Sequence, residues 1–382
     1  MWLLIIFKYM KPGSKLILVG GFLGAGKTTL LATTARLMQS QGKKVGVITN
    51  DQASGLVDTH TLAINGLEVQ EIAGSCFCCN FDGLMEAALY LRDTAQCEVI
   101  IAEPVGSCTD LSATLMQPLK AYYRQYFDLA PLTVLVDPCR LNEVFEDESK
   151  FAGGSEYIYL KQLEEADHLV VNKIDVLDKD QRTTIHRLLN TRFPDHPVSW
   201  ISASEGTGVR EWLDKIFSDP QSGKRIAQVD YDIYAEGEAL MGWYNASFIV
   251  QHSEDLLIPW KEFNKHFLQL LQQVFQHDNV VVGHLKTFLK SGHSHLNGNL
   301  TVTSGTVWVS REAFSSRSAR LILNIRAEIP PEELEEVVKE VIDVCRENGF
   351  LFEILDLKYL TPGRPEPTHR YDYVLESRSL NE

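Results

Sequence analysis

The sequence predicts an α/β fold: a doubly wound, mostly parallel sheet with helices on its faces, followed by a smaller α+β domain of ferredoxin-like outline. Three observations predict it. From Lys15 to about Phe217, short apolar runs alternate with longer helical stretches, a repetition typical of parallel sheets. A polar stretch rich in chain breakers, Asp219–Lys224, ends this alternation. Beyond it, the order strand–helix–strand occurs twice.

Six apolar runs in the first part have the length of buried strands. Each precedes a loop rich in Gly, Asn, Asp or Pro, and most are followed by a helical segment. Ligands of such sheets bind at the carboxyl ends of the strands, so residues at these ends are candidates for a site. The predicted strands are Leu16–Gly20, Lys44–Thr49, Val99–Glu103, Leu132–Asp137, His168–Asn172 and Val198–Ile201.

The second part has a different pattern. Leu321, Leu323 and Ile325 alternate on one face of a predicted strand, and Pro330-Pro331-Glu332-Glu333 opens a helix that Gly349 is placed to end. The predicted strands are Ala246–His252, Val280–Leu289, one near Leu300–Val309, Ala319–Arg326 and Leu351–Leu357, and a further helix is predicted at Trp260–Gln276. We therefore predict an N-terminal extension (1–14), a first domain (15–218), a linker (219–245) and a C-terminal α+β domain (246–382).

The composition is that of a globular protein without a disulfide framework. Of 382 residues, 45% are apolar and 23% are charged. The formal net charge of -15 repels phosphate backbones, so we expect no nucleic-acid partner. The apolar run Trp2–Phe7 is too short to span a bilayer, and we expect no membrane association. Three of the seven cysteines are crowded together, which indicates reduced thiols and a cytoplasmic protein.

A phosphate-binding motif follows the first predicted strand. The segment from Gly21 to Thr28 matches G-x-x-x-x-G-K-[ST], and its glycines let successive backbone N–H groups point at phosphate oxygens. Lys27 can reach the β- and γ-phosphates, the Thr28 hydroxyl can ligate Mg²⁺, and the next helix directs its positive end at the same anion. The sequence therefore predicts a P-loop NTPase whose nucleotide contacts are Gly21, Gly24, Ala25, Gly26, Lys27, Thr28 and Thr29.

Three acidic residues follow predicted strands and compete for the role of holding Mg²⁺ or its waters: Asp51, Glu103 and Asp137. Glu103 is favoured, because Gly106 three residues later could offer its N–H to the γ-phosphate. Asp51 could line the metal or nucleotide region, whereas Asp137 begins an ordinary Asp-Pro turn. We predict Thr28 and Glu103 as Mg²⁺ residues, Lys27 and Glu103 as catalytic residues, and Gly106 as a nucleotide contact.

The segment Asn172-Lys173-Ile174-Asp175 ends the fifth core strand and indicates guanine. The Asp175 carboxylate can accept from guanine N1–H and the exocyclic amine, the Lys173 stem can stack on the ring, and Asn172 can read the base or brace the loop. A plain turn is the alternative, since Asn and Asp are common there. After the next strand, a backbone N–H of Ser202 or Ala203 could meet guanine O6. The order of these segments favours GTP over ATP.

The segment Gly74-Ser75-Cys76-Phe77-Cys78-Cys79 places three thiols within four residues. Cys76, Cys78 and Cys79 can converge on one soft cation such as zinc or cobalt, and three ligands leave one position open, as suits a transfer site. The alternatives are an inert buried patch and a redox pair of Cys76 and Cys79. The remaining histidines and cysteines are weaker candidates. A metal-ligand role is possible but not favoured for His284, His293 and His295. We interpret Cys97, Cys108, Cys139 and Cys345 as core or incidental thiols.

The phosphate loop, the Cys-x-Cys-Cys segment, Glu103-Pro104-Val105-Gly106 and Asn172–Asp175, in this order, resemble the CobW-type branch of the metallochaperone GTPases, relatives of HypB and UreG. The resemblance covers about residues 15–217. It implies GTP hydrolysis coupled to insertion of a metal into a target enzyme, or to allocation of zinc or cobalt. The family usually has Asn-Glu-Phe-Gly where this chain has Asn50-Asp51-Gln52-Ala53, and the long His-rich tract of many zinc-handling members is absent.

We therefore predict a two-domain GTPase that binds GTP or GDP, Mg²⁺ and Zn²⁺ or Co²⁺, and delivers the transition metal to a client metalloprotein. A homodimer is compatible with the sequence. The alternative is a GTP-gated scaffold, or a GTPase associated with corrinoid proteins, in which the cysteines are structural or redox-active. Slow intrinsic hydrolysis is expected, because neither a water-positioning Gln nor an arginine finger can be named.

Overall fold

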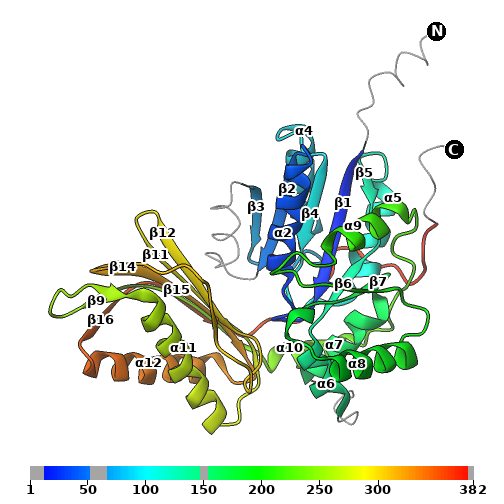
Figure 1. Ribbon diagram of the computed structural model, residues 1–382. Helices are drawn as coiled ribbons and strands as arrows, with labels where there is room; N and C mark the ends of the chain where they lie inside the picture. Colours follow the sequence, from blue (N-terminus) through cyan, green and yellow to red (C-terminus); the bar gives the residue numbers. More distant parts are fainter. Residues whose placement is uncertain (1–12, 52–66, 147–153, 377–382) are drawn as a thin grey trace.

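The computed structural model describes residues 13–51, 67–146 and 154–376. Within these ranges the chain forms two large sheets, each with its own helices (Figure 1). Apart from residues 13 and 14, the predicted N-terminal extension lies outside the described residues. In the described ranges, no helix has both the length and the apolar character that a membrane crossing needs.

The first sheet has eight strands, and all of its strand pairs are parallel. They are β1 (Ser14–Gly21), β2 (Val45–Asp51), β3 (Glu68–Ala73), β4 (Val99–Glu103), β5 (Phe127–Leu129), β6 (Thr133–Val136), β7 (His168–Val171) and β8 (Val198–Trp200). The order is β3-β2-β4-β1-β6-β7-β8, and β5 also pairs with β1. The central position of β1 places the start of the phosphate loop in the middle of the carboxyl edge.

All six strands predicted for this part are present, and the parallel sheet is confirmed. Two further strands, β3 and β5, escaped prediction. β3 lies at the sheet edge and has the polar sequence EVQEIA, of which only Ile72 is buried. β5 has three residues. A short edge strand does not need the continuous apolar run that marks a buried parallel strand.

Helices cover both faces of the first sheet. They are α2 (Lys27–Ser40), α4 (Phe81–Asp93), the π-helical turn Ser112–Met116 that continues as α5 (Gln117–Tyr122), α6 (Pro138–Glu146), α7 (Gly154–Glu165), α8 (Lys179–Arg192) and α9 (Val209–Ser218). Neighbouring residues of β1 serve opposite faces. Leu18 belongs to one buried cluster with Leu84 of α4, and Val19 belongs to another with Trp212 of α9. This division of the core is what makes the sheet doubly wound.

The second sheet has six antiparallel strands in the order β13-β12-β11-β15-β9-β16. Its strands are β9 (Gly242–His252), β11 (Val282–Ser291), β12 (Ser294–Leu300), β13 (Trp308–Val309), β15 (Ser318–Ala327) and β16 (Phe350–Leu360), and α11 (Trp260–His277) and α12 (Pro331–Glu347) lie on one side of it (Figure 1). The units β9-α11-β11 and β15-α12-β16 interleave, so the ferredoxin-like outline is confirmed. The strand predicted near Leu300–Val309 is a turn between two strands, because β12 ends at Leu300 and β13 has only two residues.

Two segments outside the predicted first domain nevertheless contact it. They are part of the predicted linker and the end of the chain. Residues 219–230 lie along it, where the Asp167 carboxylate accepts from the backbone N–H of Gly223 and Lys224. α10 (Tyr231–Ala239) then contacts α7, and a Cβ at Gly237 would lie 2.5 Å from the Gly154 carbonyl oxygen. After β16 the chain, red in Figure 1, returns across the first domain, and the N–H of Tyr371 donates to the Ala113 carbonyl. We call residues 361–376 the C-terminal tail.

Candidate functional site

The phosphate loop connects β1 to α2 and depends on glycine at two tight positions. Gly21 and Gly26 have φ values of 129° and 94°, which side chains other than glycine rarely adopt. A Cβ at Gly26 would lie 2.4 Å from Asn172 Nδ2, and a Cβ at Gly21 would lie 2.7 Å from the Leu135 carbonyl oxygen. Of the other predicted contacts, Ala25 is buried and Thr29 is exposed in the first turn of α2. The loop and the helix start are therefore placed together as predicted.

Lys27 and Thr28 open α2 at the carboxyl edge of the sheet. Lys27 is buried, and its ammonium donates to the carbonyl oxygens of Gly21 at 2.8 Å and Phe22 at 3.3 Å. The Thr28 hydroxyl donates to the Glu103 carboxylate, with O–O distances of 3.0 and 3.1 Å. Because β4 runs parallel to β1 and beside it, Glu103 at the end of β4 reaches the start of α2. A hydroxyl and a carboxylate are hard oxygen donors, which fits Mg²⁺.

The loop after Glu103 lies against the phosphate loop. A Cβ at Gly106 would lie 2.6 Å from Leu23 Cδ2 and 3.1 Å from the Leu23 backbone nitrogen. On its other side, Gln162 of α7 donates to the carbonyl oxygens of Gly106 at 2.9 Å and Cys108 at 2.8 Å. The predicted residue Gly106 is thus held directly beside the phosphate loop.

The Asn172 side chain braces two loops, one of the two roles the sequence allows. Its Nδ2 donates to the Ala25 carbonyl oxygen at 2.8 Å, and its Oδ1 accepts from the Ala203 N–H at 2.9 Å. The Ser202 N–H donates to the Thr207 carbonyl oxygen. Both N–H groups considered for guanine O6 therefore donate within the protein, and a contact with the base would require one of these bonds to be exchanged.

Lys173 and Asp175 follow Asn172 at the same edge. Lys173 has a φ of 59°, and its ammonium donates to Asp137 Oδ2 at 2.5 Å and to Thr301 Oγ1 at 3.2 Å. Asp137, which the sequence did not favour for the site, is thus the ion-pair partner of a predicted base-binding residue. Asp175 is exposed in the short turn Ile174–Val176, where its carboxylate is available to a ligand.

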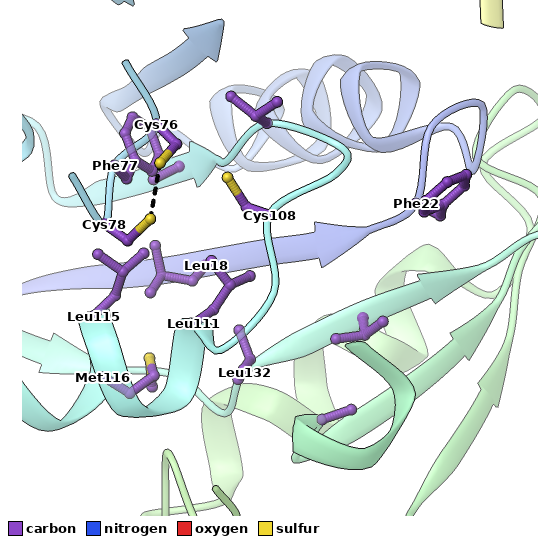
Figure 2. Packing of buried hydrophobic residues seen from close by; sticks show 14 of the residues in the cluster. Leu18, Phe22, Cys76, Phe77, Cys78, Cys108, Leu111, Leu115, Met116 and Leu132 are labelled. Atoms are coloured by element: carbon purple, nitrogen blue, oxygen red, sulfur yellow. Dashed lines mark hydrogen bonds between the residues drawn. The ribbon is translucent and has the colours of Figure 1, made fainter. Parts of the chain in front are cut away.

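The three predicted thiols converge between β3 and α4. The sulfur–sulfur distances are 2.8 Å for Cys76–Cys78, 3.2 Å for Cys76–Cys79 and 3.8 Å for Cys78–Cys79. Figure 2 shows the first of these contacts as a dashed line. Cys76 and Cys78 are buried, and Cys79 is partly exposed. Among the described residues, this is the one group of three His, Cys, Asp or Glu ligand atoms that lie within 4.8 Å of one another.

A residue from β2 fixes the thiol loop. Asn50 Nδ2 donates to the carbonyl oxygens of Ile72 at 3.0 Å and Ser75 at 2.7 Å, and its Oδ1 accepts from the Phe77 N–H at 2.8 Å. Asn50 lies one residue before Asp51, whose side chain is outside the described residues. The sequence drew attention to this strand end for its acidic residue, whereas the structure assigns the bracing role to the amide.

A fourth thiol, Cys108, was predicted to be a core or incidental thiol, and the structure places it in the buried core next to the other thiols. It is buried in the loop after Glu103, and Figure 2 shows its sulfur directed toward Cys76 and Cys78. Its hydrogen bond is the largest cause that lowers the pKa of Cys76 and the largest that raises the pKa of Cys78. The contact with Cys76 raises the pKa of Cys79 to about 11. The position of Cys108 in the same loop as Glu103 and Gly106 was the one sequence feature that could have indicated this role.

α10 adds a buried carboxyl beside the thiols. Glu238 is 2% exposed, and its Oε1 accepts from the Ser107 hydroxyl at 2.5 Å. Burial, aided by the nearby Cys76, raises the pKa of Glu238 to about 8. On the same helix, the Tyr234 hydroxyl accepts from the Thr109 N–H at 3.3 Å. No sequence pattern marks these contacts, and α10 falls in the predicted linker.

The C-terminal tail covers the thiol loop. The Glu366 N–H donates to Cys79 Sγ at 3.3 Å, and the Thr368 N–H donates to the Cys78 carbonyl oxygen at 2.8 Å. Further along, Arg370 Nε donates to Asp110 Oδ2 at 2.7 Å. The thiols are therefore enclosed by the first domain and by residues almost 290 positions later in the chain.

The weaker histidine candidates do not join the thiols. His293 and His295 lie in and beside the turn of the β11–β12 hairpin, on the second sheet. His284 of β11 is buried, and burial together with the charges of Lys286, Arg326 and Lys27 lowers its pKa well below the ordinary value. In the described part of the chain, none of the three belongs to a cluster of three ligand atoms.

Comparison with known proteins identifies the first domain. Residues 15–198 match the family model described as "CobW/HypB/UreG, nucleotide-binding domain". This part of the chain, just under half of its length, is similar to the CobW/HypB/UreG family. The CobW/HypB/UreG domain is a P-loop GTPase domain, in agreement with the expected resemblance. The match ends where β8 begins, so it does not extend to the ferredoxin-like part.

Two curated relatives and one solved structure are similar to the chain. The zinc chaperone YjiA of Escherichia coli is 26% identical over 191 residues, which are 48% of this chain and 56% of the relative. The zinc-regulated GTPase metalloprotein activator 1 of Schizosaccharomyces pombe is 24% identical over 177 residues, 44% of this chain and 41% of the relative. The chain thus spans about half the length of the curated relatives it matches. The structure of HypB from Helicobacter pylori in complex with nickel has a TM-score of 0.39 at 19% identity, covering 56% of this chain and 91% of that one.

Proposed function

We propose that the protein is a Mg²⁺-dependent GTPase that binds a transition metal, zinc or cobalt, at Cys76, Cys78 and Cys79 and delivers it to a client metalloprotein. The observation that carries the proposal is one short segment. Glu103, which bonds to Thr28 beside the phosphate loop, is five residues from Cys108, which contacts the thiols. A loop of this length can transmit a change at the γ-phosphate to the thiol cluster.

The nucleotide would lie over the phosphate loop. Backbone N–H groups of Gly24 to Thr28 would surround the phosphates, and the Lys27 ammonium would exchange the carbonyl oxygens of Gly21 and Phe22 for phosphate oxygens. Thr28 and Glu103 would hold Mg²⁺, which neutralises the negative charge of the β- and γ-phosphates. Gly106 is placed to offer its N–H to the γ-phosphate. Asp175 would accept from the guanine edge, with Lys173 beside the ring.

The metal is the cargo of the proposed activity. Thiolates suit zinc and cobalt(II), and the two curated relatives are both named for zinc. The thiols need a reducing compartment to stay available, so we place the protein in the cytoplasm. Release to a client would follow when the Glu103–Cys108 loop and the thiols separate.

The experiment is a metal titration of the reduced, metal-free protein with Zn²⁺ and Co²⁺, in the presence of a non-hydrolysable GTP analogue, of GDP, and of no nucleotide. We expect a cobalt–thiolate charge-transfer band and an affinity that differs between the nucleotide states. A thiolate site of equal affinity in all three states would contradict the coupling.

A second function, a GTP-gated scaffold with structural cysteines, is favoured by the burial of Cys76 and Cys78 beneath the C-terminal tail. Replacing Cys78 by Ser separates the two. A metallochaperone loses metal binding but keeps its fold and its GTP binding. In a scaffold, the thiol cluster stabilises the fold. The same variant of a scaffold therefore loses thermal stability, and with it the binding of its protein partner.

A further inference from the structure

Cys108 differs from the other thiols outside the Cys-x-Cys-Cys segment in its surroundings. Burial is the main cause that raises the pKa of Cys97, Cys139 and Cys345, and no other thiol is among the causes. For Cys108, the two largest influences on the pKa are its neighbours Cys76 and Cys78. It is 1% exposed in the hydrophobic core, and its sulfur is directed toward Cys76 and Cys78 (Figure 2).

The geometry of the cluster suits four sulfurs. With a Zn–S distance of about 2.3 Å, the sulfurs of a tetrahedral site lie about 3.8 Å apart. The Cys78–Cys79 distance is already 3.8 Å, and the Cys76–Cys78 and Cys76–Cys79 distances of 2.8 and 3.2 Å need to grow by about 1 Å or less. Three sulfurs from one tight loop cover one side of a cation. Cys108 comes from a different loop, and its sulfur is directed toward Cys76 and Cys78 (Figure 2). Cys108 is not among the ligand atoms that all lie within 4.8 Å of one another, so its loop has to move closer to supply the fourth corner of a tetrahedron.

The thiol loop leads directly into a helix and is fixed by hydrogen bonds. The thiols immediately precede α4, whose N-cap is Asn80, and the positive end of a helix stabilises negative charge. The Asn80 N–H donates to the Cys76 carbonyl oxygen at 2.9 Å and the Phe77 N–H to Asn50, so the loop is fixed before a cation arrives. A prearranged loop loses less conformational entropy when it binds an ion.

We propose that Cys108 is the fourth sulfur ligand of the metal, so that Cys76, Cys78, Cys79 and Cys108 form a closed four-thiolate site for a divalent cation such as zinc. The inference rests on the proposed function and deepens it. Each thiol that binds the cation releases its proton to solvent. A closed site of four sulfurs is the form that holds a metal, and a site of three leaves a position open for transfer. Because Cys108 shares its loop with Glu103 and Gly106, movement of this loop would change the number of sulfur ligands.

The test combines the full-length protein with one variant and one matched control. Co²⁺ and Zn²⁺ alone are the probes. In the wild-type protein, X-ray absorption at bound Zn²⁺ is expected to count four sulfurs. In Cys108→Ser, it is expected to count three, the cobalt–thiolate band should lose about a quarter of its intensity, and affinity should fall at least tenfold, because one of four thiolates is removed. Cys97→Ser removes a buried thiol of the same domain that lies outside the cluster, and it should behave as wild type.

Each outcome decides the proposal. Three sulfurs in the wild-type protein, with an unchanged band and affinity in Cys108→Ser, would overturn the fourth ligand and leave the proposed metal function intact. The absence of any thiolate band in the wild-type protein would overturn both. If Cys108→Ser fails to fold, as judged by its binding of a GTP analogue, the sulfur count of the wild-type protein still decides between three ligands and four.

Discussion

The Thr28 hydroxyl donates to the Glu103 carboxylate at 3.0 Å, and this bond joins the start of α2 to the end of β4. Thr28 ends the phosphate-loop motif, and Glu103 directly precedes the neighbouring loop. Because Glu103 is only 8% exposed, its charge acts in a poorly screened environment. A change at this carboxylate is therefore expected to affect the chemistry at the phosphates more strongly than binding of the base.

Replacing Glu103 by Gln removes the charge and keeps the shape. We expect Mg²⁺-dependent GTP hydrolysis to fall by about 100-fold, since a metal ion contributes several kcal/mol to the transition state. The measurement is phosphate release against Mg²⁺ concentration, and Glu98→Gln is the control. Glu98 lies one residue before β4 and pairs with the exposed Lys43. Equal rates for Glu103→Gln and wild type at saturating Mg²⁺ would show that this carboxylate does not serve the metal.

Replacing Asn172 by Ala removes the brace between the phosphate loop and the Ala203 loop. Two hydrogen bonds are lost, so we expect the free energy of unfolding to fall by about 2 kcal/mol. We also expect all nucleotides to bind more weakly. The ratio of GTP to ATP affinity should stay the same, because the side chain holds protein atoms. Nucleotide titrations measure both. A selective loss of GTP binding would mean that Asn172 contacts the base.

Asp175→Asn is the complementary change. The exposed carboxylate is expected to accept from the guanine edge, and an amide in its place offers a donor where guanine also presents donors. We expect weaker GTP binding and improved binding of xanthosine triphosphate, whose C2 oxygen accepts from the new amide. Competition binding of the two nucleotides checks this result. An unaltered preference for GTP would remove Asp175 from the base site.

The sequence could predict the parts of this site that depend on local patterns. The phosphate loop, Glu103 and the cysteine segment each rest on neighbouring residues and on strand ends, and all lie at one edge of the sheet. Asn50 and Cys108 could not be assigned their roles, because their partners come from other strands and loops. No periodicity marks a residue whose function is to contact Cys76 from about thirty residues away.

The C-terminal tail was misplaced by the sequence for a related reason. Its contacts with the thiol loop are made largely by backbone N–H groups, such as that of Thr368, which every residue except proline has. Arg370 anchors the C-terminal tail by its side chain, but in the sequence it is indistinguishable from an ordinary charged surface residue. Its partners are the buried Asp110 and the ring of Tyr231, which only the folded chain brings to it.

Replacing Arg370 by Ala tests whether the tail covers the thiols. Asp110 is fully buried and would lose one of its two partners, keeping the Tyr231 hydroxyl. We expect a loss of about 2 kcal/mol in stability, because a buried carboxylate loses its ion pair. The rate of Cys79 alkylation by iodoacetamide should rise. Arg364→Ala removes an exposed tail arginine that pairs with Asp232, and it should change neither quantity. Identical alkylation rates in both variants would show that the tail does not protect the site.

Stability should fall as the pH decreases from 6.5 toward 4, because of His168. Burial, aided by the charge of Lys215, lowers the pKa of His168 to about 4 from the ordinary 6.5. Between these values the unfolded chain binds a proton that the folded protein excludes, so the stabilisation is complete above pH 6.5 and is lost as the pH falls through the window. We expect a loss of about 2 kcal/mol from pH 7 to 5.

Urea unfolding at both pH values should show a smaller difference in His168→Gln, whose amide can still bond to Ser199. His186→Gln, a change on the exposed face of α8, controls for removal of an imidazole. An equal pH dependence in all three proteins would mean that the pKa of His168 is the same in the folded and the unfolded chain.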